Sequence, residues 1–198
     1  MKKVTGSLAV ALLIAGGLAV LAGLNERGAF AGGDKPPPKT FPVMEPSDPV
    51  RITIPALGVK ARVHDVGLAG DGSIAVPDVD RHNEAGWYEN SPTPGQYGPA
   101  VIVGHADTRT GPSVFAKLAK AKPGTKVEIT RSDRSTAVFE INSVERFPKG
   151  DQPIERIYGD FTRPALRLIT CGGEFRGGSI GYEDNIVAFA SLVEARDG

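Results

Sequence analysis

Apolar and polar residues alternate along several short segments of the chain, and this pattern predicts a protein built mainly from β-strands. Ala100–His105 differs, because it holds a continuous apolar run that is typical of a buried central strand. An Asp71-Gly72 pair before Ser73–Pro77 indicates a tight turn of the hairpin type. We expect strands at residues 50–55, 59–66, 73–77, 100–105, 126–130, 137–147, 165–171 and 185–194.

Two segments interrupt the strands with helical spacing. Residues 114–121 stop before Pro123-Gly124, and residues 153–159 form a second short turn of this kind. The chain is also rich in turn formers, with 25 glycines and 16 prolines. Regular turn spacing without long βαβ crossovers favours a mainly β fold, a closed antiparallel or mixed barrel of about eight strands with short helical insertions.

The N-terminus differs from the rest of the chain. After the positive start Met1–Lys3, residues Val4–Leu24 carry no charge and would form a helix roughly 31 Å long, enough to cross a bilayer. We therefore expect a cytoplasmic stub and transmembrane anchor at 1–24, with the remainder exported across the cell membrane. The alternative is a cleaved signal peptide, since Ala29–Ala31 resembles a small-residue cleavage site.

Residues 25–48 lack apolar periodicity and contain three consecutive prolines, which is typical of an extended extracellular linker. The folded domain is then 49–198, long enough for one sizeable core. Twenty-three basic and 23 acidic residues cancel, so no overall charge points to a nucleic acid partner. No pattern indicates a cofactor, and the three histidines lack the spacing of a metal site.

Cys171 is the only cysteine, and it lies where the apolar run Leu166–Ile169 gives way to two glycines. A free cysteine is often a buried hydrophobe, so packing is one interpretation. An unpaired thiol outside the cell risks oxidation, however, and the end of a strand presents a side chain to ligands from a rigid base. A nucleophile is the second interpretation, and it requires a base or cation nearby.

His105 is the best candidate for that base, because it also ends an apolar run and enters a polar loop. If the two runs are central strands of one sheet, parallel or offset pairing would bring both ends to the same rim. His64 and His82 lie in polar contexts that favour structural or exposed roles. Asp107 could orient the imidazole, with a solvated loop aspartate as the alternative.

Arg176 is the candidate cation. It is the only arginine between Cys171 and Arg196, in a glycine-rich loop. Acyl transfer to a thiol places negative charge on the carbonyl oxygen under attack, and a fixed guanidinium stabilises that charge. A solvated loop arginine is the alternative.

The segments "VIVGHADTRTGPSVFAKL" and "LRLITCGGEF" resemble the histidine and cysteine motifs of the sortases, above all actinobacterial class F, with class E next. "VRITIPALGVKARV" and "AGWYENSPTPGQYGPA" resemble the same group, as does the layout of anchor and spacer. The resemblance implies an eight-stranded barrel acting as a membrane-anchored cysteine transpeptidase. It makes Cys171 the nucleophile, His105 the acid and base, and Arg176 the oxyanion-stabilising group, although the arginine of relatives usually stands elsewhere.

The resemblance also implies the partners. The acyl donor would be an exported protein with a C-terminal sorting signal similar to Leu-Pro-x-Thr-Gly, and the acceptor an amine of a cell-wall precursor or of another protein. Cell-wall partners imply a Gram-positive, actinobacterial cell surface. No acidic cluster supports the calcium site of some other sortases.

Three alternatives stay open from the sequence. A cysteine L,D-transpeptidase of another family usually has histidine and glycine just before the cysteine, where this chain has Ile169-Thr170. An extracellular binding module would use Cys171 only for packing. A degenerate sortase would bind a sorting signal without turning it over.

Overall fold

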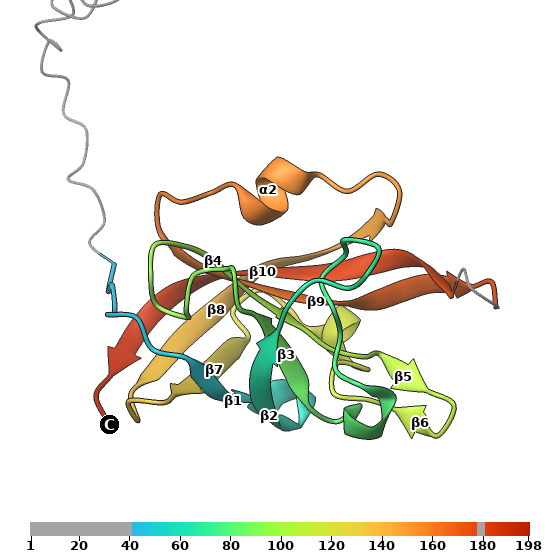
Figure 1. The fold of residues 1–198 in the computed structure, drawn as a ribbon. Coiled ribbons are helices and arrows are strands. Elements are labelled where there is room, and N and C mark those ends of the chain that lie inside the picture. Colours follow the sequence, from blue (N-terminus) through green and yellow to red (C-terminus); the bar gives the residue numbers. More distant parts are fainter. Residues whose placement is uncertain (1–40, 178–180) are drawn as a thin grey trace, which may run out of the picture. The chain divides into compact units, whose positions relative to one another are not determined.

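The computed structural model describes residues 41–177 and 181–198, and the strands within them form a closed barrel (Figure 1). The order around the barrel is β1-β2-β3-β4-β9-β10-β8-β7, so the predicted eight-stranded barrel is confirmed. Most neighbours are antiparallel, but β2 with β3 and β4 with β9 are parallel. The strands are β1 (Pro49–Ile54), β2 (Val59–Val66), β3 (Ala85–Tyr88), β4 (Gly98–Val103), β7 (Lys126–Arg131), β8 (Thr136–Pro148), β9 (Pro164–Phe175) and β10 (Tyr182–Arg196).

The remaining elements are short. The strands β5 (Asp107–Thr108) and β6 (Gly111–Pro112) form a small hairpin directly after β4, and α2 (Ile154–Tyr158) lies between β8 and β9. Three 3₁₀ turns complete the described elements, at Pro55–Leu57, Val79–Arg81 and Leu118–Lys120.

The expected strand at 73–77 is wrong, and β3 is the strand that completes the barrel instead. Asp71 accepts hydrogen bonds from the backbone N–H and the hydroxyl of Ser73, which fixes a turn at the start of this segment. The segment then pairs with the chain only through an isolated β-bridge between Ile74 and Leu68. Strand β3 does not alternate in sequence, because it packs on both faces. Its Gly86 lies so close to β2 that a Cβ there would come within 2.7 Å of Val66.

The expected helix at 114–121 is a 3₁₀ turn over Leu118–Lys120 only. Its backbone bonds span three residues, as from Leu118 N–H to the Phe115 carbonyl. Phe115 and Leu118 are buried in the core. The apolar spacing therefore predicted the buried face correctly, although the helical element is shorter than expected.

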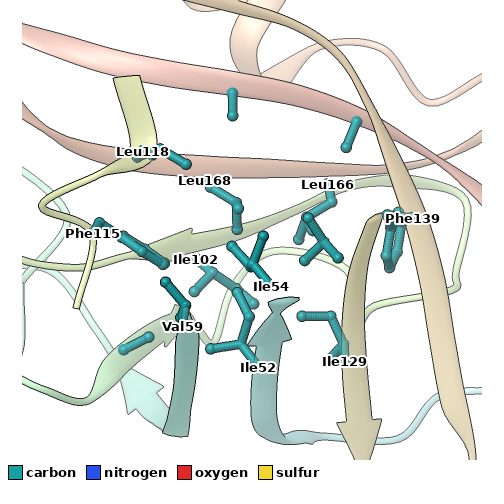
Figure 2. Close-up of a cluster of buried hydrophobic side chains, with 14 of the residues drawn as sticks. Ile52, Ile54, Val59, Ile102, Phe115, Leu118, Ile129, Phe139, Leu166 and Leu168 are labelled. Atoms are coloured by element: carbon teal, nitrogen blue, oxygen red, sulfur yellow. The ribbon is translucent and has the colours of Figure 1, made fainter. Parts of the chain in front are cut away.

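The barrel interior is filled by aliphatic and aromatic side chains that converge from opposite strands (Figure 2). Ile52 and Ile54 point inward from β1, Ile102 from β4, and Leu166 and Leu168 from β9, all fully buried. Each such burial stabilises the fold by roughly 1.5–3 kcal/mol. The even-numbered residues of β9 therefore face the interior.

The odd-numbered residues of β9 up to Ile169 face outward, and α2 packs on this part of the strand. Ile169 packs with Val187 and Ile157 in a second apolar cluster on this outer face. Arg167 fixes α2 there, because its Nε donates to the Ile157 carbonyl at 3.0 Å and its guanidinium lies over Phe189. Burial lowers the pKa of Arg167.

The end of the expected linker packs on the barrel. The Met44 N–H donates to the Gly95 carbonyl at 2.9 Å, and Arg131 donates to the Glu45 carbonyl. The predicted anchor at 1–24 and the linker up to residue 40 lie outside the described residues. Within the described part, no helix is both long and apolar enough to span a bilayer.

Candidate active site

The parallel pairing of β4 with β9 determines where Cys171 and His105 lie. Val103 is the register partner of Ile169, and the next residue continues the ladder, because the Gly104 N–H donates to the Ile169 carbonyl at 3.1 Å. Thr170 strengthens this link by donating from its hydroxyl to the Gly104 carbonyl at 2.8 Å. His105 and Cys171 each lie two residues after a paired residue, so they meet where the pairing of β4 with β9 ends, as predicted. The expected strand end at residue 171 is wrong, because β9 continues to Phe175 by pairing with β10.

The two side chains also point to the same face. Val103 and Ile169 belong to the outer apolar cluster, and side chains two residues further along a strand return to that face. Both Cys171 and His105 are half-buried, and both line one cavity of about 690 Å³. A thiol and an imidazole are therefore presented together to one accessible space.

His105 is oriented by a backbone carbonyl. Its Nε2 lies 2.6 Å from the Pro77 oxygen, and a carbonyl only accepts, so Nε2 carries the proton and donates. This leaves Nδ1 as the ring atom that can exchange a proton with a substrate or with Cys171. Asp107, the candidate orienting group, accepts instead from the Tyr182 hydroxyl at 2.5 Å.

Arg176 lies beside the site without lining either cavity next to Cys171. Its side chain is half-exposed and forms ion pairs with Glu174 at 3.1 Å and with Glu183 at 2.7 Å. Its oxyanion role stays a prediction. Two other arginines line a cavity together with Cys171, namely Arg109 and Arg146.

Nothing in the sequence pattern pointed to Arg146, because it reaches the site across strands. Arg146 lies in β8 and pairs with Ile186 of β10, which in turn pairs with Thr170. Its Nε lies 3.2 Å from the Asp184 carboxylate, and it lines a second cavity of about 580 Å³ beside Cys171. Only the register of the folded sheet brings these positions together.

The other two histidines are engaged elsewhere. The Nδ1 of His64 lies 3.3 Å from the Glu84 carboxylate, and the Nδ1 of His82 lies 3.1 Å from the Ser113 hydroxyl. Neither histidine lines a cavity with Cys171. Among the residues that the structure describes, no cluster of three histidine, cysteine or acidic side chains could hold a metal ion.

The Tyr182–Asp107 hydrogen bond joins the start of β10 to the loop that follows His105. Because of this bond, we expect the Tyr182 hydroxyl to titrate at a shifted pH. The bond from the hydroxyl to the Asp107 carboxylate is the main cause that raises the pKa of Tyr182, and burial and the charge of Cys171 add to it. The bond is therefore fully present below pH 10, the ordinary tyrosine value, and is lost as the pH rises through the raised pKa.

We expect this tyrosine to titrate above its ordinary range in absorbance at 295 nm, isolated as the difference between the wild type and Tyr182→Phe. In an Asp107→Asn background the same difference should move back toward the ordinary value, because the neutral amide places no charge beside the phenolate. Equal midpoints in the two backgrounds would show that the bond does not form.

The structure thus combines a closed β barrel with a thiol and an imidazole on two adjacent parallel strands, just beyond their paired residues. Residues 52–193 match the family model of the sortase domain, and the chain belongs to the sortase family. It is thus, in general terms, a sortase-type transpeptidase. No curated protein matches the sequence.

Solved sortases of several classes share the fold. Sortase A from Corynebacterium diphtheriae is 19% identical with a TM-score of 0.57, and the alignment covers 76% of this chain and 62% of that one. Sortase A from Listeria monocytogenes is 16% identical with a TM-score of 0.57, over 75% of this chain and 89% of that one. Sortase E1 from Streptomyces coelicolor, solved with a tripeptide in its active site, is 18% identical with a TM-score of 0.57. That alignment covers 76% of this chain and 90% of the other.

Proposed function

We propose that the protein is a membrane-anchored cysteine transpeptidase that cleaves a C-terminal sorting signal similar to Leu-Pro-x-Thr-Gly and transfers the protein to an amine. The observation that carries this proposal is the placement of Cys171 and His105. They lie just beyond the paired residues of two adjacent parallel strands, share a face and line one cavity. Acyl transfer requires a nucleophile and a proton donor within reach of one scissile bond.

In the acylation step, the Cys171 thiolate attacks the threonine carbonyl of the signal. The sulfur electron pair forms the S–C bond, and the carbonyl π pair moves to oxygen as an oxyanion. When this intermediate collapses, the C–N bond breaks and the glycine amine leaves with a proton from the His105 imidazolium. The Pro77 carbonyl keeps the ring in a position from which Nδ1 can deliver that proton.

Deacylation reverses these roles. An incoming amine attacks the thioester carbon, and neutral His105 accepts the proton that the amine loses as the new amide bond forms. The S–C bond then breaks and returns the electron pair to Cys171. Water in place of the amine gives hydrolysis, so access to the cavity determines whether the product is transferred or released.

The segments outside the described residues supply the rest of the proposal. The uncharged run Val4–Leu24 would anchor the chain with a cytoplasmic N-terminus, and the proline-rich spacer would hold the catalytic domain outside the cell. The acceptors would then be amines of cell-wall precursors or of other exported proteins. By the resemblance of its histidine and cysteine motifs, the chain would belong with the actinobacterial class F sortases, with class E as the next nearest group.

A degenerate sortase that binds its signal without turnover is the second candidate. The ion pairs of Arg176 with Glu174 and Glu183 favour it, because they neutralise the guanidinium that the resemblance assigns to the oxyanion. A binding protein would retain the cavity and lose only the chemistry.

Trapping the acyl-enzyme separates these candidates. The full chain is incubated with a library of peptides ending in variants of Leu-Pro-x-Thr-Gly and then acid-quenched, and its intact mass is measured. We expect the mass of one acyl group, located on Cys171 by digestion, and its disappearance when triglycine is added. Saturable peptide binding with no covalent mass would identify the degenerate sortase and contradict the proposed transpeptidase.

A further inference from the structure

Asn185 is the cross-strand neighbour of Cys171. Strand β10 pairs antiparallel with β9, and Asn185 is the register partner of Cys171. Directly paired residues of antiparallel strands point to the same face, with Cβ atoms about 4.5–5.5 Å apart. His105 and Asn185 therefore flank Cys171 on either side, the histidine beyond β4 and the asparagine on β10.

The packing of the neighbouring residues confirms which face this is. Val187, two residues after Asn185, and Ile169, two residues before Cys171, both belong to the outer apolar cluster. Phe147 of β8, the other register partner of Asn185, packs against that cluster too. The Asn185 carboxamide thus projects from the outer face, as the thiol does.

Asn185 has unused hydrogen-bonding capacity at this position. Its side chain is half-buried, and among the described residues it makes no hydrogen bond. By contrast, the side chain of Asn142 in the neighbouring strand β8 donates to the Ser191 hydroxyl at 2.8 Å. A carboxamide with two N–H donors beside a nucleophile can donate to negative charge that develops there.

Two of the described arginines, Arg109 and Arg146, line a cavity with Cys171, whereas Asn185 is placed by its register opposite Cys171. Arg146 pairs with Ile186, one residue along from Asn185, so its position in β8 alternates to the other side of the sheet, and its Nε is held by the Asp184 carboxylate. Arg109 lies at the tip of the β5–β6 hairpin, with no described ion pair to hold its guanidinium. Arg176 is bound by two glutamates.

We infer that Asn185 is a catalytic residue that donates a hydrogen bond from its carboxamide to the oxyanion formed when Cys171 attacks a carbonyl. This inference rests on the proposed function and adds an oxyanion donor to its acylation step. A neutral amide fits a site beside Glu183 and Asp184, because it needs no counter-charge to stay available. Oxyanion stabilisation at this site then depends on the alignment of β9 with β10.

Two small reagents test this role without a sorting signal. In p-nitrophenyl acetate the thiolate forms an S–C bond through an oxyanion, and p-nitrophenolate leaves with the C–O electron pair. In iodoacetamide the thiolate displaces iodide from a CH₂ carbon, and no oxyanion forms. A donor to the oxyanion affects the first reaction only.

We expect Asn185→Ala in the full chain to slow the p-nitrophenolate burst roughly 10²-fold, with alkylation by iodoacetamide changed less than about twofold. Asn185→Asp should be at least as slow, because a carboxylate repels the oxyanion. Asn142→Ala is the matched control, and it should react as the wild type does in both assays.

The opposite results are equally clear. An unchanged burst in Asn185→Ala, equal slowing of both reagents, or a wild type without a Cys171-dependent burst would overturn the inference. A loss in Arg176→Ala with none in Asn185→Ala would return the role to the arginine. The acyl-enzyme trapping with peptides is independent of this assay, so failure of the proposed function and failure of this inference give different results.

Discussion

Replacing Cys171 by alanine is expected to abolish peptide cleavage and transfer by the full chain. No other cysteine exists to take over the attack, and removal of the nucleophile from an enzyme with a covalent intermediate lowers kcat by up to about 10⁶-fold. The measurement is the release of the glycine-containing fragment from a fluorogenic Leu-Pro-x-Thr-Gly peptide, with triglycine as the acceptor.

The control for this variant is its stability and its peptide affinity. Cys171 is half-buried in β9, beyond the residues that pair with β4, so alanine should leave the midpoint of urea unfolding nearly unchanged. Peptide binding should persist, since the cavity walls come from other side chains. Turnover of Cys171→Ala within tenfold of the wild type would rule out a thioester route.

The barrel was largely predictable, because a buried strand of a closed sheet leaves a clear apolar pattern. The parallel contact of β2 with β3 was not, and the expected strand at 73–77 shows why. Ser73–Pro77 alternates as a strand should, yet the Asp71–Ser73 turn and the lack of a neighbour leave it unpaired. The true strand β3 is short and packed on both faces, so it shows no alternation.

The candidate site was predictable only as far as strand ends could be located. Cys171 and His105 each follow an apolar run, and that local signal is visible along the chain. Their neighbours depend on pairing between distant segments. Pro77 lies 28 residues before the histidine that it orients, and Asn185 meets Cys171 only through the β9–β10 register.

Arg176 illustrates the same limit from the other side. In the sequence it is the natural cation near Cys171, because it lies five residues further along the chain. The fold pairs it with Glu183 across the β9–β10 hairpin, and Glu174, two residues before it in β9, contacts it as well. Proximity along a chain does not determine which charges a side chain meets, since cross-strand partners compete for it.

The second large effect is expected at His105. His105→Ala should lower kcat/KM for the peptide by roughly 10²–10⁴-fold, because the leaving glycine amine is expelled poorly without a proton. The loss should be much smaller with p-nitrophenyl acetate, whose leaving group needs no proton. Comparing the two substrates therefore separates proton donation from any effect on the thiol itself.

Two further variants make the test specific to this imidazole. His64→Ala and His82→Ala remove histidines that bind Glu84 and Ser113 outside the cavities, so both variants should keep wild-type turnover. Imidazole added to His105→Ala should restore part of the peptide activity, because it can enter the cavity and deliver the missing proton. Equal losses with the peptide and the ester, without rescue, would mean that His105 acts on the nucleophile alone and that the leaving amine takes its proton from another group.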